Sequence, residues 1–123
     1  MTLPDSSTTI DDLKQIVRRF VEQRDWKQFH APKNLSMSLA IEAAELMEHF
    51  QWLSVEASRQ LNPKDANWQA VADELADVVC YALALANEME IDLSTAVRHK
   101  MARNEQKYPA EEFHGKYRRD PQA

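Results

Sequence analysis

The chain has 123 residues and a formal net charge of −5 at pH 7. This length fits one domain, and the negative charge favours divalent cations over nonspecific nucleic acid as partners. The single glycine, Gly115, excludes a glycine-rich phosphate loop of the P-loop or dinucleotide type. We expect a cytoplasmic protein without a membrane span: the longest apolar run, residues 78–86, is too short to cross a bilayer, and residues 5–7 are polar where a signal core would be apolar.

The first predicted helix runs from Thr9 to about Gln23. Thr9 and Asp12 have the spacing of a capping box, in which each side chain accepts a hydrogen bond from the other residue's backbone. Residues 25–34 then interrupt the helical periodicity. They are predicted to form a loop, rich in aromatic and polar groups, that ends in a proline turn.

Three further helices are predicted along the rest of the chain. Their expected ranges are residues 34 or 36 to 53, 65–90 and 93–107, with a short helical turn within residues 54–64. Four helices with short connections predict an all-α fold, a four-helix bundle that is oligomeric. We expect a single helical domain over residues 1–109 and a flexible C-terminal tail over residues 110–123.

Two pairs of carboxylates have the spacing that puts each pair on one helix face. The pairs are Glu42 with Glu45, and Glu74 with Asp77. Glu42 lies within an apolar stripe formed by Leu35, Leu39, Leu46 and Leu53, and Glu74 lies within another formed by Val71, Val78 and Leu85. Because charges are rarely buried without a partner, the pattern predicts that these acids hold a hard divalent cation, Mg²⁺ or Mn²⁺.

Two other interpretations of these acids remain open. Most Glu and Asp side chains lie on solvated helix faces, and any one of the four fits that description. A di-iron site would pair a Glu with a His three residues later. Here Glu45 and His49 are four residues apart, and no His lies near Glu74 or Asp77, so magnesium or manganese is favoured over iron.

Aromatic side chains lie close to both acidic pairs in the sequence. Trp52 comes two helical turns after Glu45, Tyr81 comes two turns after Glu74, and Trp26 lies in the loop before the second helix. Flat rings beside a metal site suit stacking on a nucleobase, and the alternative is plain core or interface packing. Cys80 lies in an apolar helical run and is predicted to be a buried thiol in a reducing compartment.

The last predicted helix carries a basic and amide-bearing face. The residues at the three-and-four spacing of this face are Lys100, Arg103, Asn104 and Lys107. Such a face can neutralise the phosphate oxygens of a substrate. The alternative is that these cations only complement the dipole at the C-terminal end of the helix.

Taken in order, these residues resemble those of the MazG-like all-α nucleotide pyrophosphohydrolases, and most closely the dCTP pyrophosphatase branch. The resemblance extends from about residue 9 to residue 109. Its markers are residues 24–30 (RDWKQFH), 32–35 (PKNL), 42–45 (EAAE), 50–52 (FQW) and 74–78 (ELADV), followed by Lys100, Asn104 and residues 108–109. The ordered set is far more specific than either acidic pair alone.

The resemblance implies an Mg²⁺-dependent enzyme that cleaves a nucleoside triphosphate, dCTP or a modified dCTP, to the monophosphate and pyrophosphate. It assigns the metal to Glu42, Glu45, Glu74 and Asp77, and the phosphates to Lys100 and Asn104. It places Trp26, Trp52 and Tyr81 around the base and sugar, together with His30 and Asn34. It also implies a homodimer or homotetramer with sites where protomers meet. Glu45 is the first candidate for orienting the attacking water, and the other acids remain open.

Two departures from the family pattern bear on specificity. Ile41 stands where the wider MazG motif has a second Glu, which fits the dCTP-type branch. Val17 stands where animal dCTP-type relatives have a His in the first helix, so the base preference stays open. The alternative function is a non-catalytic helical interaction module that uses the acidic pairs and the Trp residues to bind a partner.

Overall fold

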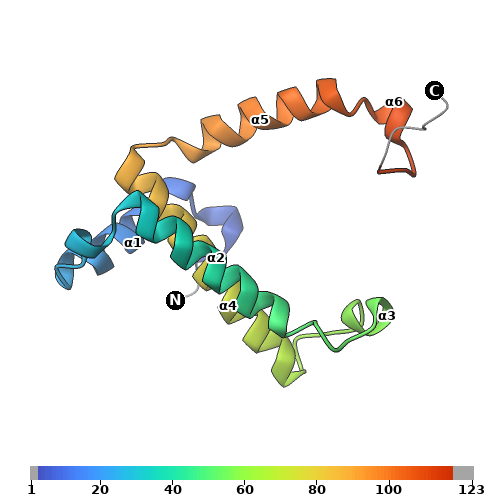
Figure 1. Cartoon of the computed structure of the whole chain (residues 1–123), viewed down its shortest axis with the longest axis horizontal. Helices are drawn as coiled ribbons and strands as arrows, with labels where there is room; N and C mark the ends of the chain where they lie inside the picture. Colours follow the sequence, from blue (N-terminus) through green and yellow to red (C-terminus); the bar gives the residue numbers. More distant parts are fainter. Residues whose placement is uncertain (1–2, 118–123) are drawn as a thin grey trace. The chain divides into compact units, whose positions relative to one another are not determined.

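The structure is a computed structural model that describes residues 3–117 (Figure 1). Its regular elements within that range are two short 3₁₀ turns and six α-helices. In chain order they are η1 (Asp5–Ser7), α1 (Ile10–Gln23), η2 (Lys27–Phe29), α2 (Pro32–Glu48), α3 (Val55–Ser58), α4 (Ala66–Met89), α5 (Leu93–Lys107) and α6 (Ala110–Phe113). The prediction of an all-α fold is confirmed.

Helix α1 begins where the capping box predicts. The Asp12 backbone N–H donates to the Thr9 hydroxyl at 3.0 Å, and the Thr9 N–H donates to the Asp12 carboxylate at 2.9 Å. These two bonds satisfy backbone donors that the first helical turn leaves without partners. The short helix α3 is capped in a similar way, since the Ser54 hydroxyl accepts from the Ala57 N–H at 3.0 Å.

Helix α2 begins and ends earlier than the sequence predicted. Pro32 is its first residue instead of part of a turn before it, because proline at this position gives up only an N–H that has no helical partner. The helix ends at Glu48 and not at Leu53. The Phe50 N–H bonds back to the Met47 carbonyl and the Leu53 N–H to the Phe50 carbonyl, so three-residue turns replace the α-helical pattern. Trp52 therefore does not lie on α2.

Helices α4 and α5 match their predicted ranges to within one residue. Helix α4 ends at Met89 and is capped by Glu90, a residue in the left-handed region with φ 53° whose N–H reaches back to the last turn of the helix. Helix α5 begins after Asp92, whose carboxylate accepts from the Thr95 N–H at 3.1 Å. No helix in the described part of the chain is long and apolar enough to cross a membrane.

Helix α4 is the centre of the first of two compact units, which ends at Glu90. Helix α2 packs along α4, as the teal and yellow-green ribbons of Figure 1 show, and α1 packs against another part of α4. The buried hydrophobic side chains of the described residues all belong to these three helices: Val21, Leu35, Leu83, Ala84 and Ala86. The core is therefore small, and most of it lies on the C-terminal half of α4.

The second unit begins at Ile91 and contains α5 and α6. Within it, the rings of Tyr108 and Phe113 meet edge to face at 5.1 Å, which ties α6 to the end of α5. Because α5 belongs to this second unit, the four-helix bundle stays a prediction, as do the domain boundary at residue 109 and the flexibility of the tail. Residues 118–123 of that tail lie outside the described residues.

Candidate functional site

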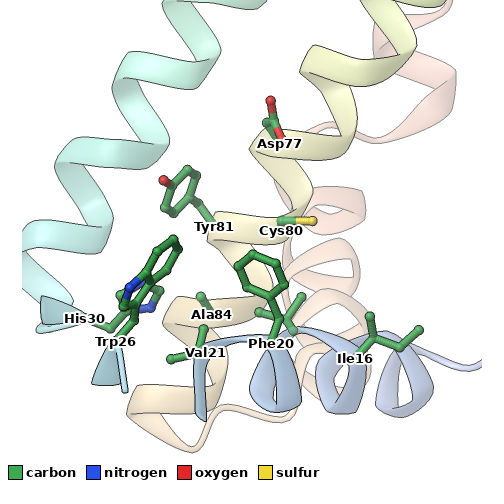
Figure 2. A pocket seen from close by; sticks show the side chains of 10 residues that line it. Ile16, Phe20, Val21, Trp26, His30, Asp77, Cys80, Tyr81 and Ala84 are labelled. Atoms are coloured by element: carbon green, nitrogen blue, oxygen red, sulfur yellow. The ribbon is translucent and has the colours of Figure 1, made fainter. Parts of the chain in front are cut away.

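A cavity of about 350 Å³ lies between α1, α4 and the loop that follows α1 (Figure 2). Its lining residues are Ile16, Val17, Phe20 and Val21 from α1, Trp26 and His30 from the loop, and Asp77, Cys80, Tyr81 and Ala84 from α4. The α4 residues follow the three-and-four spacing of one helix face, as Figure 2 shows. The result is an apolar, aromatic chamber with a carboxylate in its wall. Its volume lies in the range of small-molecule sites.

The loop that carries Trp26 is held by contacts with the end of α1. The Trp26 N–H donates to the Val21 carbonyl at 3.0 Å, and the Trp26 ring meets the Phe20 ring edge to face at 5.7 Å. The Arg24 guanidinium lies over the Phe20 ring, 3.7 Å from its centroid. Asp25 makes the turn possible with a φ of 52°, a conformation that Asp tolerates better than most residues. These contacts fix one aromatic wall of the cavity.

Two of the cavity's walls contain residues that the sequence reasoning missed. Phe20 was not predicted to be a site residue, although it shares an apolar face of α1 with Val17. Cys80 was predicted to be buried, but it is exposed and lines the cavity. The prediction was wrong because the apolar run around Cys80 faces an open chamber on this side and not a filled core. Partial burial raises the pKa of the Cys80 thiol, and the charge of Asp77 raises it further.

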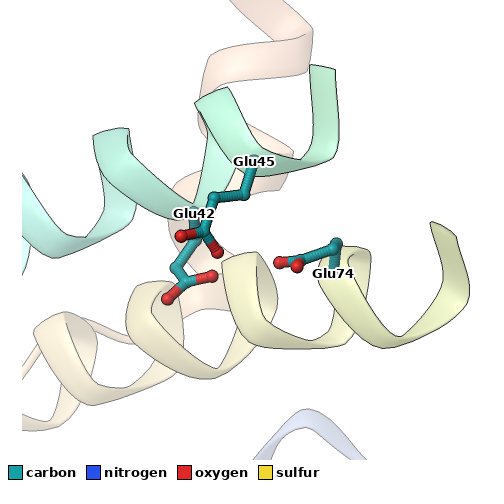
Figure 3. A group of neighbouring side chains, drawn as sticks. All are labelled: Glu42, Glu45 and Glu74. Atoms are coloured by element: carbon teal, nitrogen blue, oxygen red, sulfur yellow. The ribbon is translucent and has the colours of Figure 1, made fainter. Parts of the chain in front are cut away.

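An acidic cluster lies where α2 passes α4 (Figure 3). Glu42 and Glu45 extend from α2, and Glu74 extends toward them from α4. Each of the three half-buried carboxylates offers one oxygen atom, and these oxygens all lie within 4.8 Å of one another. The structure thus brings together three of the four acids that their spacing singled out, from two helices separated by a long connection.

The cluster contains carboxylate oxygens that no protein group satisfies. The Oε2 atoms of Glu42 and Glu74 are buried and accept no hydrogen bond from the described residues. The pKa of Glu42 is raised from 4.5 to about 7, mainly by burial. A hydrogen bond with Glu45 and the negative charge of Glu45 raise this pKa further, as do a hydrogen bond with Glu74 and the negative charge of Asp77. Buried acceptors without a donor are costly, and a cation would satisfy them. This donor set, made only of carboxylate oxygens, fits a hard divalent cation such as Mg²⁺ or Mn²⁺.

Asp77 connects the acidic cluster to the cavity. It lies one turn of α4 beyond Glu74, its charge acts on the Glu42 carboxyl, and its side chain lines the cavity. A ligand in the cavity would therefore have its apolar part against α1 and the aromatic loop, and a cationic or cation-bound part toward the acids. This continuity between two chemically different regions is the main feature of the site.

Two of the remaining predicted site residues, Trp52 and Asn34, belong to the first unit but do not line the cavity. Trp52 is 88% exposed in the segment after α2, and Asn34 lies in the first turn of α2, where its side-chain amide donates to the Phe29 carbonyl at 3.3 Å. Lys100 is exposed on α5, and the Asn104 amide contacts the sulfur of Met101 at 3.7 Å. Both α5 residues belong to the second unit, so their substrate contacts stay predictions.

Comparisons with known proteins identify the family of this chain. The model of the MazG-like family matches residues 37–119, which include the acidic residues of both helices. This chain belongs to the MazG-like family. Among curated relatives, dCTP pyrophosphatase 1 of Rattus norvegicus is 41% identical over 106 residues, and that of Homo sapiens is 38% identical over 107 residues. The matches cover 82% and 83% of this chain, respectively.

The curated relatives are longer than the region they share with this MazG-like chain. The chain spans 59% of the length of the rat protein and 60% of the human protein. A crystal structure of a pyrophosphatase from Archaeoglobus fulgidus matches with a TM-score of 0.74 and 40% identity, and the match covers 81% of this chain and 92% of that one. The relatives matched by sequence and the solved structure matched by fold are all named pyrophosphatases.

Proposed function

We propose that this protein is a divalent-cation-dependent nucleoside triphosphate pyrophosphohydrolase that acts on dCTP or a modified dCTP. The observation that carries the proposal is the continuity, through Asp77, between a cluster of unsatisfied carboxylates and an aromatic cavity. A nucleoside triphosphate has the matching chemistry, because its flat base is joined to a phosphate chain that binds Mg²⁺. The names of the rat and human relatives support dCTP as the substrate, and the name of the archaeal structure supports a pyrophosphatase.

Glu42, Glu45, Glu74 and Asp77 would hold Mg²⁺, or Mn²⁺ in its place. Bound there, the cation supplies charge neutralisation on the phosphate chain and a lowered pKa for water. Glu45, whose carboxylate lies in the cluster with those of Glu42 and Glu74, would orient the attacking water or accept its proton. The buried oxygens of Glu42 and Glu74 have no protein donor among the described residues, which suits them to ligation.

The cavity would hold the base and sugar. Trp26 and Tyr81 offer aromatic faces for stacking, and His30 offers a ring nitrogen for a hydrogen bond to the base. Val17 lines the same chamber and contributes apolar surface to it. Lys100 and Asn104 of α5 would stabilise negative charge that develops on the phosphate oxygens, and Trp52 and Asn34 complete the proposed substrate contacts.

A homo-oligomer, either a dimer or a tetramer, is part of the proposal. One face of α2 carries Met37, Ala40, Ile41 and Ala44 at helical spacing, and all four are exposed. On α4, Leu75 is 50% exposed and Val79 is 42% exposed. A second copy that covers these faces would remove apolar area from water and bring the two protomers' acidic helices together. Ile41→Lys should then reduce the mass measured by light scattering to that of the monomer.

The test of the function is a pyrophosphate-release assay with the full chain. Common and 5-modified deoxy- and ribonucleoside triphosphates are compared, first with Mg²⁺ and then with EDTA. The proposal expects metal-dependent release of pyrophosphate, concentrated on cytosine deoxynucleotides. Release from another base would keep the chemistry and change the specificity, with Val17 the first residue to examine. No release from any nucleotide, together with no rise in Tm on adding Mg²⁺ and a nonhydrolysable dCTP, would favour the interaction module.

A further inference from the structure

Asn87 joins α1 to α4 beside the cavity, although it does not line it. The Asn87 side-chain N–H donates to the Lys14 carbonyl at 3.0 Å, and the Arg18 guanidinium donates to the Asn87 side-chain oxygen at 3.1 Å. Both bonds connect residues about 70 positions apart, from the first turns of α1 to the end of α4. The amide thus uses its donor and its acceptor at once, and reversing it would lose both bonds.

The two bonds hold α1 at residues on either side of Val17, which lines the cavity. Lys14 and Arg18 lie one turn apart, and Val17 lies between them on the same side of the helix. Phe20 follows on the next turn and carries the ring against which Trp26 packs. A change in the position of α1 over α4 would therefore move the apolar wall and the aromatic loop together.

Apolar packing alone leaves this position loosely specified. Where α1 meets α4, the buried side chains are Val21 on one helix and small or aliphatic residues such as Ala84 on the other. Apolar contacts are non-directional, so a helix can slide or rotate over such a surface at little cost. Hydrogen bonds have a preferred length and angle, and two of them to one side chain define both the height and the rotation of α1.

We infer that Asn87 is a positioning residue for the base pocket: it sets the α1 wall of the cavity and, through Phe20, the place of Trp26. The inference rests on the proposed function in so far as the cavity is taken to hold the base. The residue acts through α1 and touches no substrate. Its loss should weaken the binding and selection of the base while the acidic cluster, which α2 and α4 form, is left intact.

The experiment compares Asn87→Asp with wild-type full-length chain. The Asp variant keeps an acceptor for Arg18 but puts an oxygen against the Lys14 carbonyl, so it breaks one bond with little change in volume. We expect KM for the preferred nucleotide to rise about five- to tenfold with kcat retained, as the loss of one such bond implies. The preference for that base over others should fall in the same measurement.

Two companion variants keep the test decisive if Asn87→Asp fails to fold. Arg18→Met removes only the second bond and should raise KM by a smaller factor. Arg19→Met, which changes the neighbouring exposed arginine, is the matched control and should leave both constants unchanged. A purely structural role would lower the folded fraction, which reduces kcat and leaves KM and base preference as they are. That pattern would overturn the inference.

Hydrogen exchange separates this inference from the proposed function. In Asn87→Asp, the amides of residues 16–21 and 26–30 should exchange faster, while those around Glu42 and Glu45 stay as in the wild type. If wild-type protein releases no pyrophosphate, the proposed function fails and the exchange pattern decides the role of Asn87 by itself. Unchanged exchange along α1 overturns the inference whatever the activity.

Discussion

The acidic cluster and the apolar cavity lie on neighbouring stretches of α4, but they are built differently. Three half-buried carboxylates from α2 and α4 form the cluster, and each helix contributes its acids through its own periodicity. The cavity takes its walls from α1, a loop and α4, and depends on how these pieces sit together. The cluster should therefore be sensitive to charge and robust to small movements, whereas the cavity should respond to changes in packing.

The largest expected effect comes from removing one charge of the cluster. Glu45→Gln keeps the shape of the side chain and takes away a carboxylate oxygen. Mutating a residue that only supports a metal ligand lowers activity by up to about 100-fold, so losing a ligand itself should lower turnover by at least about 100-fold. Asp77→Asn should behave in the same way. The helical content seen by circular dichroism should stay as in the wild type.

The matched control for this charge change lies on the same helix. Glu48 is exposed at the end of α2, outside the cluster, and Glu48→Gln should leave turnover unchanged. If Glu45→Gln and Asp77→Asn both retain activity, the four acids do not hold a catalytic metal. The proposed difference in function between the cluster and the cavity would then be wrong.

The next effect concerns the aromatic wall. Trp26→Leu should raise KM about tenfold with a small change in kcat, because stacking of a base on an aromatic ring contributes roughly 1–3 kcal/mol. Trp52→Leu provides the comparison, since Trp52, also proposed to contact the substrate, is 88% exposed and lies outside the cavity of its own protomer. An effect of Trp52→Leu as large as that of Trp26→Leu would mean that another protomer or the second unit completes the pocket.

A smaller effect should appear in the pH dependence of stability. The pKa of Glu42 is raised from 4.5 to about 7, so between these values the folded protein holds a proton that the unfolded chain has released. The stability of the metal-free protein should fall as pH rises through this window. Its Tm should be lower at about pH 8 than at about pH 5.5, as measured by thermal melting in EDTA.

Mg²⁺ and a variant test the origin of this pH effect. Mg²⁺ competes with the proton for the same carboxylates, so the rise in Tm that it causes should be larger at the higher pH. In Glu42→Gln the fall of Tm between the two pH values should be weaker than in the wild type. An equal fall in both proteins would assign the effect to other groups.

The smallest expected effect comes from the start of α1. Thr9→Ala removes one half of the capping box and should lower the free energy of unfolding by about 1 kcal/mol. Thr9 lies far along α1 from the cavity, so KM for the nucleotide should not change. Urea denaturation measures the stability, and the pyrophosphate assay measures KM. A rise in KM would show that fraying of α1 reaches Val17.

Much of the fold was predictable because its signals are local. The capping box at Thr9, the end of α4 at Met89 and the start of α5 after Asp92 follow from neighbouring residues in the sequence. The inward position of Glu42 and Glu74 was also predictable, because a charge within an apolar stripe can be recognised from helical spacing alone. Local propensity failed at the end of α2, where turns after Glu48 take Trp52 off the helix.

The sequence by itself thus determined the helices and the pairing of the acids, since both depend on spacing within one segment. Only the tertiary structure decided that Cys80 faces an open chamber, that Phe20 supports Trp26, and that Asn87 connects α1 to α4. These contacts join residues from different elements. The spacing of apolar residues along a sequence does not determine which helices pack against each other. The acids could be found along the chain, whereas the pocket exists only where three segments meet.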